Sequence, residues 1–341
     1  MKEICIIGTG WYGLYAGLLL KNKYKITFIE KNNDIFDNSS YRNQNRLHEG
    51  YHYPRSFETR QLCIDGYTKF INKFNNLLDN IENNCYLISN DSLIDYDTFV
   101  HIYKYENYHF REIENDEFAN IQKNVILVDE KIINSDKSKK YFKNELSNCQ
   151  FIFDYTVKNI VNNNNKVTIN DELHFDFCFD CTFNQLQLDK KEYIYEQTIS
   201  LLYKRKDTTF NKCVTIMDGE FLSLYPHDID KNIYTLTHVK YSPLISSNNF
   251  DDVKNYQLNN DDLKEIIELF EKDTIKYFPR FYNYFEYTDE YFKAFKTKIK
   301  CKNDTRKLNI YKNENIVSVN CGKITGIFQL EEYIKNELKL I

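Results

Sequence analysis

Glycine and proline are scarce in this chain, and several features that would define a protein class are missing. Its 341 residues include nine glycines and four prolines, against 28 tyrosines and 25 phenylalanines. The 45 basic and 50 acidic side chains give a net charge of -5, so the chain lacks the basic surplus of a nucleic-acid-binding domain and we expect no nucleic-acid partner. No apolar run reaches the roughly 18 to 20 residues of a membrane span, which predicts a soluble protein.

The nine cysteines lack the spacing of a disulfide framework. The only close pair, Cys178 and Cys181, lies in an apolar run that is typical of a strand. No second cysteine pair or histidine pair follows, so we interpret both as packing residues and predict no metal, with a redox or zinc half-site as the alternative. The odd, scattered count favours reduced cysteine in the cytoplasm, and a first strand beginning at Lys2 leaves no room for a signal peptide.

Three of the scarce glycines lie in a turn that is typical of dinucleotide binding. Gly8, Gly10 and Gly13 follow the apolar run 4–7, and a helical pattern and a second strand follow them, ending at Glu30. Strand, glycine turn, helix, strand and carboxylate within about thirty residues form the dinucleotide fingerprint. Gly8 permits a tight turn, Gly10 lets the backbone approach a pyrophosphate, and Gly13 lets the helix pack closely on the strand.

Glu30 indicates which dinucleotide is bound. Its carboxylate would accept hydrogen bonds from a ribose diol and repel a 2′-phosphate, so FAD or NAD fits better than NADP. The alternative is a glycine-rich turn in another kind of α/β protein. Trp11 and Tyr12 occupy the variable positions of the candidate cofactor-binding turn, and we interpret their bulky side chains as local packing.

The polar segment 40–56 has an unusual density of functional side chains. It holds three Arg, two His and three Tyr in seventeen residues, whereas an ordinary surface loop would favour Lys, Asp and Ser. The alternative is a solvated loop with aromatic anchors. From Ser56 onward, a three- and four-residue spacing of apolar side chains predicts an amphipathic helix through Leu62, Tyr67, Phe70, Ile71, Phe74, Leu77, Leu78 and Ile81.

The sequence Arg-Asn-Gln-Asn-Arg-Leu-His-Glu-Gly-Tyr-His-Tyr-Pro (42–54) resembles a known family, the FAD-dependent oxidoreductases of the D-amino-acid oxidase type. It is most similar to L-2-hydroxyglutarate dehydrogenase-like members and to relatives encoded near surface-polysaccharide genes. In that family the segment runs from the adenine and pyrophosphate to the flavin ring. Residues 217–226 resemble a substrate-domain strand that faces the flavin, and 316–326 resemble a strand–glycine–helix unit near the flavin pyrimidine.

The stretch 175–184 is similar to a late strand that ends beside the cofactor in this family. The family usually has a small residue and a glycine where Phe183 and Asn184 stand here, so the backbone path at this point is open. The resemblance implies FAD as the cofactor. The candidate contacts are Gly8, Gly10, Trp11, Tyr12, Gly13, Glu30, Lys31, Arg42, Asn45, Arg46, Leu47, His48, Thr182, Gly322, Lys323, Ile324 and Thr325.

The predicted fold is α/β, with a Rossmann-like FAD-binding domain and a second domain built on an antiparallel sheet. At about 150 residues per domain, the length fits two domains. We predict a discontinuous FAD-binding domain at 1–85, 151–188 and 300–341, and a substrate or cap domain at 86–150 and 189–299.

Local patterns add a few expectations to this architecture. The Tyr- and Phe-rich stretch 192–241 predicts antiparallel strands, and 261–277 predicts a helix that stops before a proline. The polar runs 134–148 and 162–165 are interpreted as loops. Residues 85–150 resemble no family segment.

The resemblance implies an oxidoreductase that removes hydride from a C–H next to a hydroxyl or amine on a small or sugar-like substrate and delivers it to flavin N5. His48 is the candidate base, because related 2-hydroxy-acid enzymes have a histidine before glycine there; a structural histidine is the alternative. His52 and Tyr53 are secondary catalytic candidates. Candidate substrate contacts are Arg55, Arg306, Tyr225 and His238, with surface salt bridges as the alternative for the two arginines.

Two other functions stay open. One is redox-neutral chemistry on a nucleotide sugar, as in proteins similar to UDP-galactopyranose mutase. The other is a catalytically idle protein that keeps its cofactor for a binding role. The substrate could therefore be a sugar, a nucleotide sugar or a 2-hydroxy acid.

Overall fold

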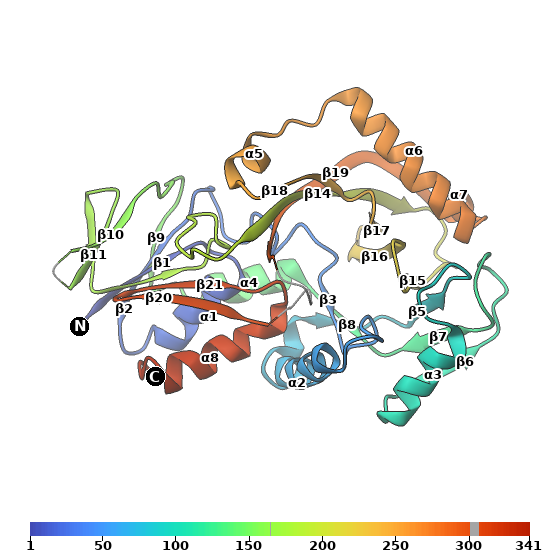
Figure 1. Cartoon of the computed structure of the whole chain (residues 1–341), viewed down its shortest axis with the longest axis horizontal. Coiled ribbons are helices and arrows are strands. Elements are labelled where there is room, and N and C mark those ends of the chain that lie inside the picture. The colour runs from blue at the N-terminus through green and yellow to red at the C-terminus, as the bar shows by residue number, and fades with distance from the viewer. Residues whose placement is uncertain (164, 301–306) are drawn as a thin grey trace.

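The computed structural model describes residues 1–163, 165–300 and 307–341. Most strands belong to two sheets, one of six strands and one of nine, that lie next to each other along the longest axis of the molecule (Figure 1). Among the described residues, no helix is both long and apolar enough to cross a membrane.

The six-stranded sheet draws its strands from both ends of the chain and from its middle. Its order is β20-β21-β13-β1-β2-β9, parallel except for the edge strand β20. The strands are β1 (Glu3–Ile7), β2 (Lys25–Ile29), β9 (Gln150–Ile152), β13 (Phe177–Asp180), β20 (Asn309–Asn313) and β21 (Ile316–Asn320).

Both faces of this sheet are covered, as its apolar strands require. On one face, Ile4 and Ile6 of β1 pack with residues of α1 (Trp11–Leu20) and α8 (Ile327–Asn336), which lie side by side (Figure 1). On the other face, Cys5 and Ile7 pack with a three-stranded sheet. That sheet consists of β10 (Ile160–Asn163), β11 (Lys166–Ile169) and β12 (Leu173–Phe175).

The nine-stranded sheet is antiparallel except for one parallel pair, β5 with β15. Its strands are β5 (Asn83–Ile88), β6 (Phe110–Ile113), β7 (Val125–Val128), β14 (Tyr193–Arg205), β15 (Lys212–Met217), β16 (Leu222–Asp228), β17 (Ile233–His238), β18 (Pro243–Ser247) and β19 (Phe285–Ile299). The helices packed on it are α3 (Tyr96–Tyr105), α5 (Phe250–Asn255), α6 (Asn260–Tyr277) and α7 (Phe281–Tyr284).

A small sheet connects the two large ones. It has the order β3-β8-β4, with β3 (Arg46–Leu47), β8 (Lys131–Ile133) and β4 (Leu78–Asp79). Helix α2 (Phe57–Phe74), the 3-10 turn η1 (Asn75–Leu77) and α4 (Ser135–Glu145) pack against it, and a second 3-10 turn, η2 (Ile324–Gly326), precedes α8. The segment 42–54 thus lies where the two large sheets meet.

The interpretation of 134–148 as a loop was wrong, because α4 occupies most of it. Asn134 caps this helix by accepting the Lys137 N–H at 2.8 Å. Phe142 is fully buried, with its ring 5.2 Å from that of Trp11. The helix was not recognised from the sequence because its exposed face is polar. Its few buried residues pack with the six-stranded sheet, so this part of 86–150 lies with that sheet.

Three other expectations need correction. Asn162 and Asn163 belong to β10 rather than to a loop. Residues 217–226 form the end of β15, a turn and most of β16 rather than one strand. The predicted helix after Ser56 ends at Phe74, because the backbone of Leu78 pairs with β8. The helix predicted at 261–277 and the strand–glycine–helix unit at 316–326 are confirmed.

Candidate functional site

The glycine turn follows β1 and holds α1 close to that strand. Gly8 has a φ of +92°. A Cβ on Gly13 would lie 2.0 Å from the Gly8 carbonyl oxygen and 3.2 Å from Cγ2 of Ile6, so only glycine fits at this position. The prediction that Gly13 permits close helix–strand packing is therefore confirmed. The side chain of Trp11 is buried against Phe36, Phe70, Phe74 and Phe142, which confirms its packing role.

The N-terminus of α1 is suited to an anion. Its N-cap is Gly10, which provides no side-chain cap, and no acidic residue lies in the first turn. The Trp11 N–H donates to Ser40 Oγ at 3.0 Å, a neutral partner. A helix N-terminus without an acidic residue in its first turn favours a phosphate group, so the residues present fit a pyrophosphate.

Glu30 lies at the end of β2 and is fixed to this turn. Its Oε2 accepts the backbone N–H of Thr9 at 2.9 Å and the Thr9 hydroxyl at 2.7 Å, and its Oε1 accepts the Asn32 N–H at 3.1 Å. The carboxylate therefore has a defined position beside the pyrophosphate-type turn, where a ribose diol would require it.

A cavity of about 240 Å³ opens next to Glu30, between the two large sheets. Its lining includes the cations Lys31, Arg42, Lys254 and Lys293 and one carboxylate, Asp37, which accepts from Arg42 at 2.6 Å. The excess of positive charge suits phosphate oxygens. Together, the turn, Glu30 and this cavity fit the adenosine diphosphate part of FAD.

At the end of β13, Phe183 and Asn184 stand where the resembling family has a small residue and a glycine. Phe183 and Asn184 both adopt left-handed conformations, with φ of +63° and +59°. Thr182 donates to Asp180 from its backbone N–H at 3.0 Å and from its hydroxyl at 2.6 Å, and burial raises the pKa of Asp180. Non-glycine residues thus reach a turn conformation that favours glycine, at an energetic cost.

Within the segment 42–54, Arg46 points away from the surface. Its side chain is 5% exposed, and the guanidinium lies 4.0 Å from the Tyr225 ring centroid and donates to the Tyr86 hydroxyl at 2.7 Å. The Nε of Arg46 has no acceptor among the described residues. Asn45 and Leu47 flank it; Leu47 is buried, and Asn45 has a φ of +51°.

The predicted substrate contacts do not all gather at one place. Tyr225 faces Arg46, and its hydroxyl donates to Asn84 Oδ1 at 2.5 Å. His238 lies on the opposite face of the nine-stranded sheet, under α6, where its Nε2 is 3.2 Å from Asp273 and burial lowers its pKa. The structure therefore brings Tyr225, but not His238, to the segment 42–54.

The two arginines predicted to bind substrate have different positions. The side chain of Arg55 is 59% exposed, and its Nε donates to Asp218 Oδ2 at 2.5 Å, in the turn between β15 and β16. Arg306 lies outside the described residues. The fork of Arg55 already binds a carboxylate of this chain.

The three catalytic candidates lie together. The ring centroids of His48 and His52 are 5.4 Å apart, and those of His52 and Tyr53 are 5.3 Å apart. The ammonium group of Lys323 lies 4.1 Å from the Tyr53 ring centroid and donates to its hydroxyl. Burial and the charge of Arg46 lower the pKa of Lys323 to about 7. The loop Gly322–Thr325 thus reaches the candidate catalytic residues.

A buried carboxylate beside His48 was missed from the sequence. Oε1 of Glu130, a residue 1% exposed, lies 3.8 Å from His48 Nδ1 and accepts the Glu49 N–H at 2.8 Å. Its Oε2 accepts the Tyr86 hydroxyl at 2.7 Å. Burial, and then the charge of Glu130, raise the pKa of Glu49 to about 7. The only signal was one acidic pair in the apolar run 125–133.

The comparisons with known proteins agree with this architecture. No protein-family model matches the chain. The FAD-dependent monooxygenase FPY4 of Fusarium mangiferae is 30% identical over 338 residues, which cover 96% of this chain and 89% of the relative. The FAD-dependent monooxygenase kojA of Aspergillus flavus is 35% identical over 85 residues, 25% of this chain and 20% of the relative.

Two solved structures share the fold over nearly the whole chain. L-α-glycerophosphate oxidase from Mycoplasma pneumoniae, with FAD bound, has a TM-score of 0.74 at 14% identity and covers 99% of this chain and 94% of its own. Glycine oxidase from Geobacillus kaustophilus has a TM-score of 0.71 at 9% identity and covers 96% and 91%.

Proposed function

Because this chain belongs to the FAD-dependent oxidoreductases of the D-amino-acid oxidase type, we propose that it oxidises a C–H bond next to an amine or hydroxyl group of a small molecule. The family, the α/β fold, the FAD cofactor and the enzyme class were predicted correctly. When bound, FAD supplies the acceptor for two electrons. The residues of the chain must therefore bind the substrate, orient it and accept the proton that it loses.

The gathering of His48, His52, Tyr53 and Lys323 is the observation that supports this proposal. His48 takes the proton of the substrate O–H or N–H at Nε2, because its Nδ1 faces Glu130 at 3.8 Å. A buried carboxylate stabilises the imidazolium that results. His52 and Tyr53 orient the substrate beside it.

Positive charge at the same place favours an anionic group. Arg46 and Lys323 both lie in this region, and the charge of Arg46 contributes to the lowered pKa of Lys323. Arg55 binds a substrate anion only by exchanging it for Asp218, whereas Tyr225 already faces Arg46. The substrate class that fits is a small amino acid, a 2-hydroxy acid or a related sugar acid.

In the cofactor site, the Gly8–Gly13 turn and the N-terminus of α1 would hold the pyrophosphate of FAD, and Glu30 would hold the ribose. Lys31, Arg42 and Thr182 would add contacts along the cofactor, and the loop Gly322–Thr325 would contact the flavin.

Monooxygenation is the second candidate, and the name of the relative that is 30% identical over 96% of this chain favours it. That reaction consumes O₂ and needs an external reductant, whereas an oxidation of the substrate itself needs neither to reduce the flavin.

Mixing the FAD-loaded protein with candidate substrates, first without O₂ and then with it, separates these chemistries. We expect a small amino acid, 2-hydroxy acid or sugar acid to bleach the visible flavin absorption with no added reductant. Turnover only with reduced pyridine nucleotide and O₂ would replace the proposal by monooxygenation. Turnover of a nucleotide sugar only after reduction by dithionite would replace it by redox-neutral chemistry, and no response to any compound would contradict all three.

A further inference from the structure

The loop that holds His48, His52 and Tyr53 is fixed from behind by side chains outside it. The Tyr103 hydroxyl donates to the Tyr51 carbonyl at 2.9 Å and to the Gly50 carbonyl at 3.2 Å. These bonds tie the loop to α3, which belongs to the segment without any recognised resemblance. A side chain of α3, rather than solvent, therefore binds these backbone carbonyls of the candidate catalytic loop.

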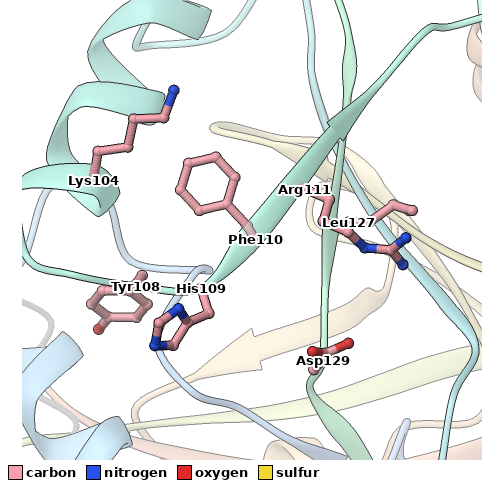
Figure 2. A pocket seen from close by; sticks show the side chains of 7 residues that line it. All are labelled: Lys104, Tyr108, His109, Phe110, Arg111, Leu127 and Asp129. Atoms are coloured by element: carbon pink, nitrogen blue, oxygen red, sulfur yellow. The ribbon is translucent and has the colours of Figure 1, made fainter.

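The backbone of the loop at Gly50 lies close to the tyrosine side chains behind it. Gly50 has a φ of +123°, and a Cβ there would lie 2.8 Å from the Tyr108 hydroxyl. The rings of Tyr51, Tyr103 and Tyr108 lie with their centroids 4.9 to 5.1 Å apart. Figure 2 shows Tyr108 and His109 on the segment between α3 and β6, at a cavity of about 370 Å³. The side chain of Tyr51 is thus packed against these rings, so aromatic contacts and hydrogen bonds together restrain the loop.

Arg60, in the first turns of α2, provides the strongest of these bonds. It is 5% exposed, and its Nη1 donates to the carbonyl oxygens of Tyr53 at 2.9 Å and Pro54 at 2.6 Å. Its Nε donates to Glu106 Oε2 at 2.9 Å, and its Nη2 donates to the other carboxylate oxygen. Glu106 is the C-cap residue of α3.

We propose that Arg60, held in its orientation by Glu106, is a positioning residue that sets the place of His52 and Tyr53 in the reaction. The inference rests on the proposed function, because it assigns these two side chains to the substrate site. Arg60 does not touch the reacting atoms. It acts through the backbone carbonyls at 53 and 54 that it binds.

The chemistry of the contact favours positioning over stability alone. A buried ion pair is costly to desolvate, and apolar residues of similar volume often stabilise a fold as well or better. The planar guanidinium fork, in contrast, can bind a carboxylate with one edge and two carbonyls with the other, which fixes a geometry that lysine cannot reproduce. Small displacements matter in such sites, because a shift of about 1 Å can cost roughly 100-fold in rate.

The test compares Arg60→Lys and Glu106→Gln with a matched control in the FAD-loaded full chain. The control is Arg205→Lys, since Arg205 also donates to a backbone carbonyl, that of Phe210 at 2.9 Å, but is the last residue of β14 and, in the part of the chain that the structure describes, makes no hydrogen bond to residues 48–56. The measurements are FAD content, melting temperature, kcat, KM, and deuterium exchange of peptides that cover residues 48–56.

For Arg60→Lys we expect full FAD content, amide exchange in 48–56 at least about tenfold faster, and kcat lower by about 10- to 100-fold with KM within about threefold. Glu106→Gln should also speed amide exchange in 48–56 and lower kcat, by smaller factors. Arg205→Lys should lower only the melting temperature. Exchange in 48–56 that matches the control would overturn the inference, whether or not a substrate is known. Faster exchange with an unchanged kcat would overturn it too, while leaving the proposed oxidation intact.

Discussion

Replacing Glu30 by alanine should weaken FAD binding more than it weakens the fold. Its carboxylate is held beside the glycine turn by three hydrogen bonds of 2.7 to 3.1 Å, two from Thr9 and one from Asn32. A charge-assisted hydrogen bond to a ribose hydroxyl contributes about 1.5 to 3 kcal/mol. At about 1.4 kcal/mol per factor of ten, Kd for FAD should rise roughly 10- to 150-fold.

A second effect acts in the same direction. Thr9 is fully buried, and without Glu30 its N–H loses its acceptor, so the turn that meets the pyrophosphate is itself less well fixed. Glu30→Gln keeps the shape and one acceptor oxygen but removes the charge. We therefore expect it to fall between the wild type and Glu30→Ala.

The assay is a titration of apoprotein with FAD, followed by quenching of flavin fluorescence. Asp176→Ala is the matched control, because Asp176 also accepts a backbone N–H, that of Glu3 at 2.8 Å, elsewhere on the same sheet. An FAD affinity of Glu30→Ala within twofold of the wild type would refute the assignment. So would an equal loss in the control, which would indicate a general loss of stability.

Three further predictions follow from the same geometry. His48→Ala should retain FAD but slow substrate-dependent flavin reduction by about 10²- to 10⁴-fold in stopped flow; loss of FAD or full activity would contradict the role of a base. Arg55→Lys should mainly raise KM if Arg55 grips an anion, and an unchanged KM would leave it as the partner of Asp218 alone. The pKa of Glu49 is raised to about 7, so the folded state binds the proton of Glu49 more tightly than the unfolded state does, and stability falls as pH rises from about 4.5 to 7. Glu49→Gln should remove this pH dependence, worth at most about 3 kcal/mol, from melting curves recorded against pH. An unchanged pH dependence would contradict the assignment.

The features that could be predicted from the sequence depend on contiguous residues. The turn from Gly8 to Gly13 is recognisable because its strand, helix and acidic residue follow within one short stretch. The segment 42–54 is recognisable for the same reason, and the structure brings its His48, His52 and Tyr53 together. Local spacing was sufficient for these features.

The features that could not be predicted depend on distant residues. Glu130 meets the Glu49 N–H across 81 positions, and Glu106 meets Arg60 across 46. Glu106 has no local pattern that distinguishes it from a solvated side chain, and the only local sign at Glu130 is an acidic pair within an apolar run. Helix α4 was missed for a related reason, because most of its surface is polar and only contacts with distant aromatic rings, such as that of Trp11, show which face is buried.

The order of strands in the six-stranded sheet has a consequence for how the protein is made. Strand β1 pairs with β13, and β13 pairs with β21, so Cys5 lies beside Cys178 and Cys178 beside Ile316. Contacts between residues so far apart in the chain form slowly during folding. The glycine turn is synthesised early, but the sheet on which it rests is incomplete until β21 has been translated. We therefore expect stable cofactor binding to follow synthesis of that strand, and we expect a nascent chain arrested before it to expose the edge of β13 that pairs with β21.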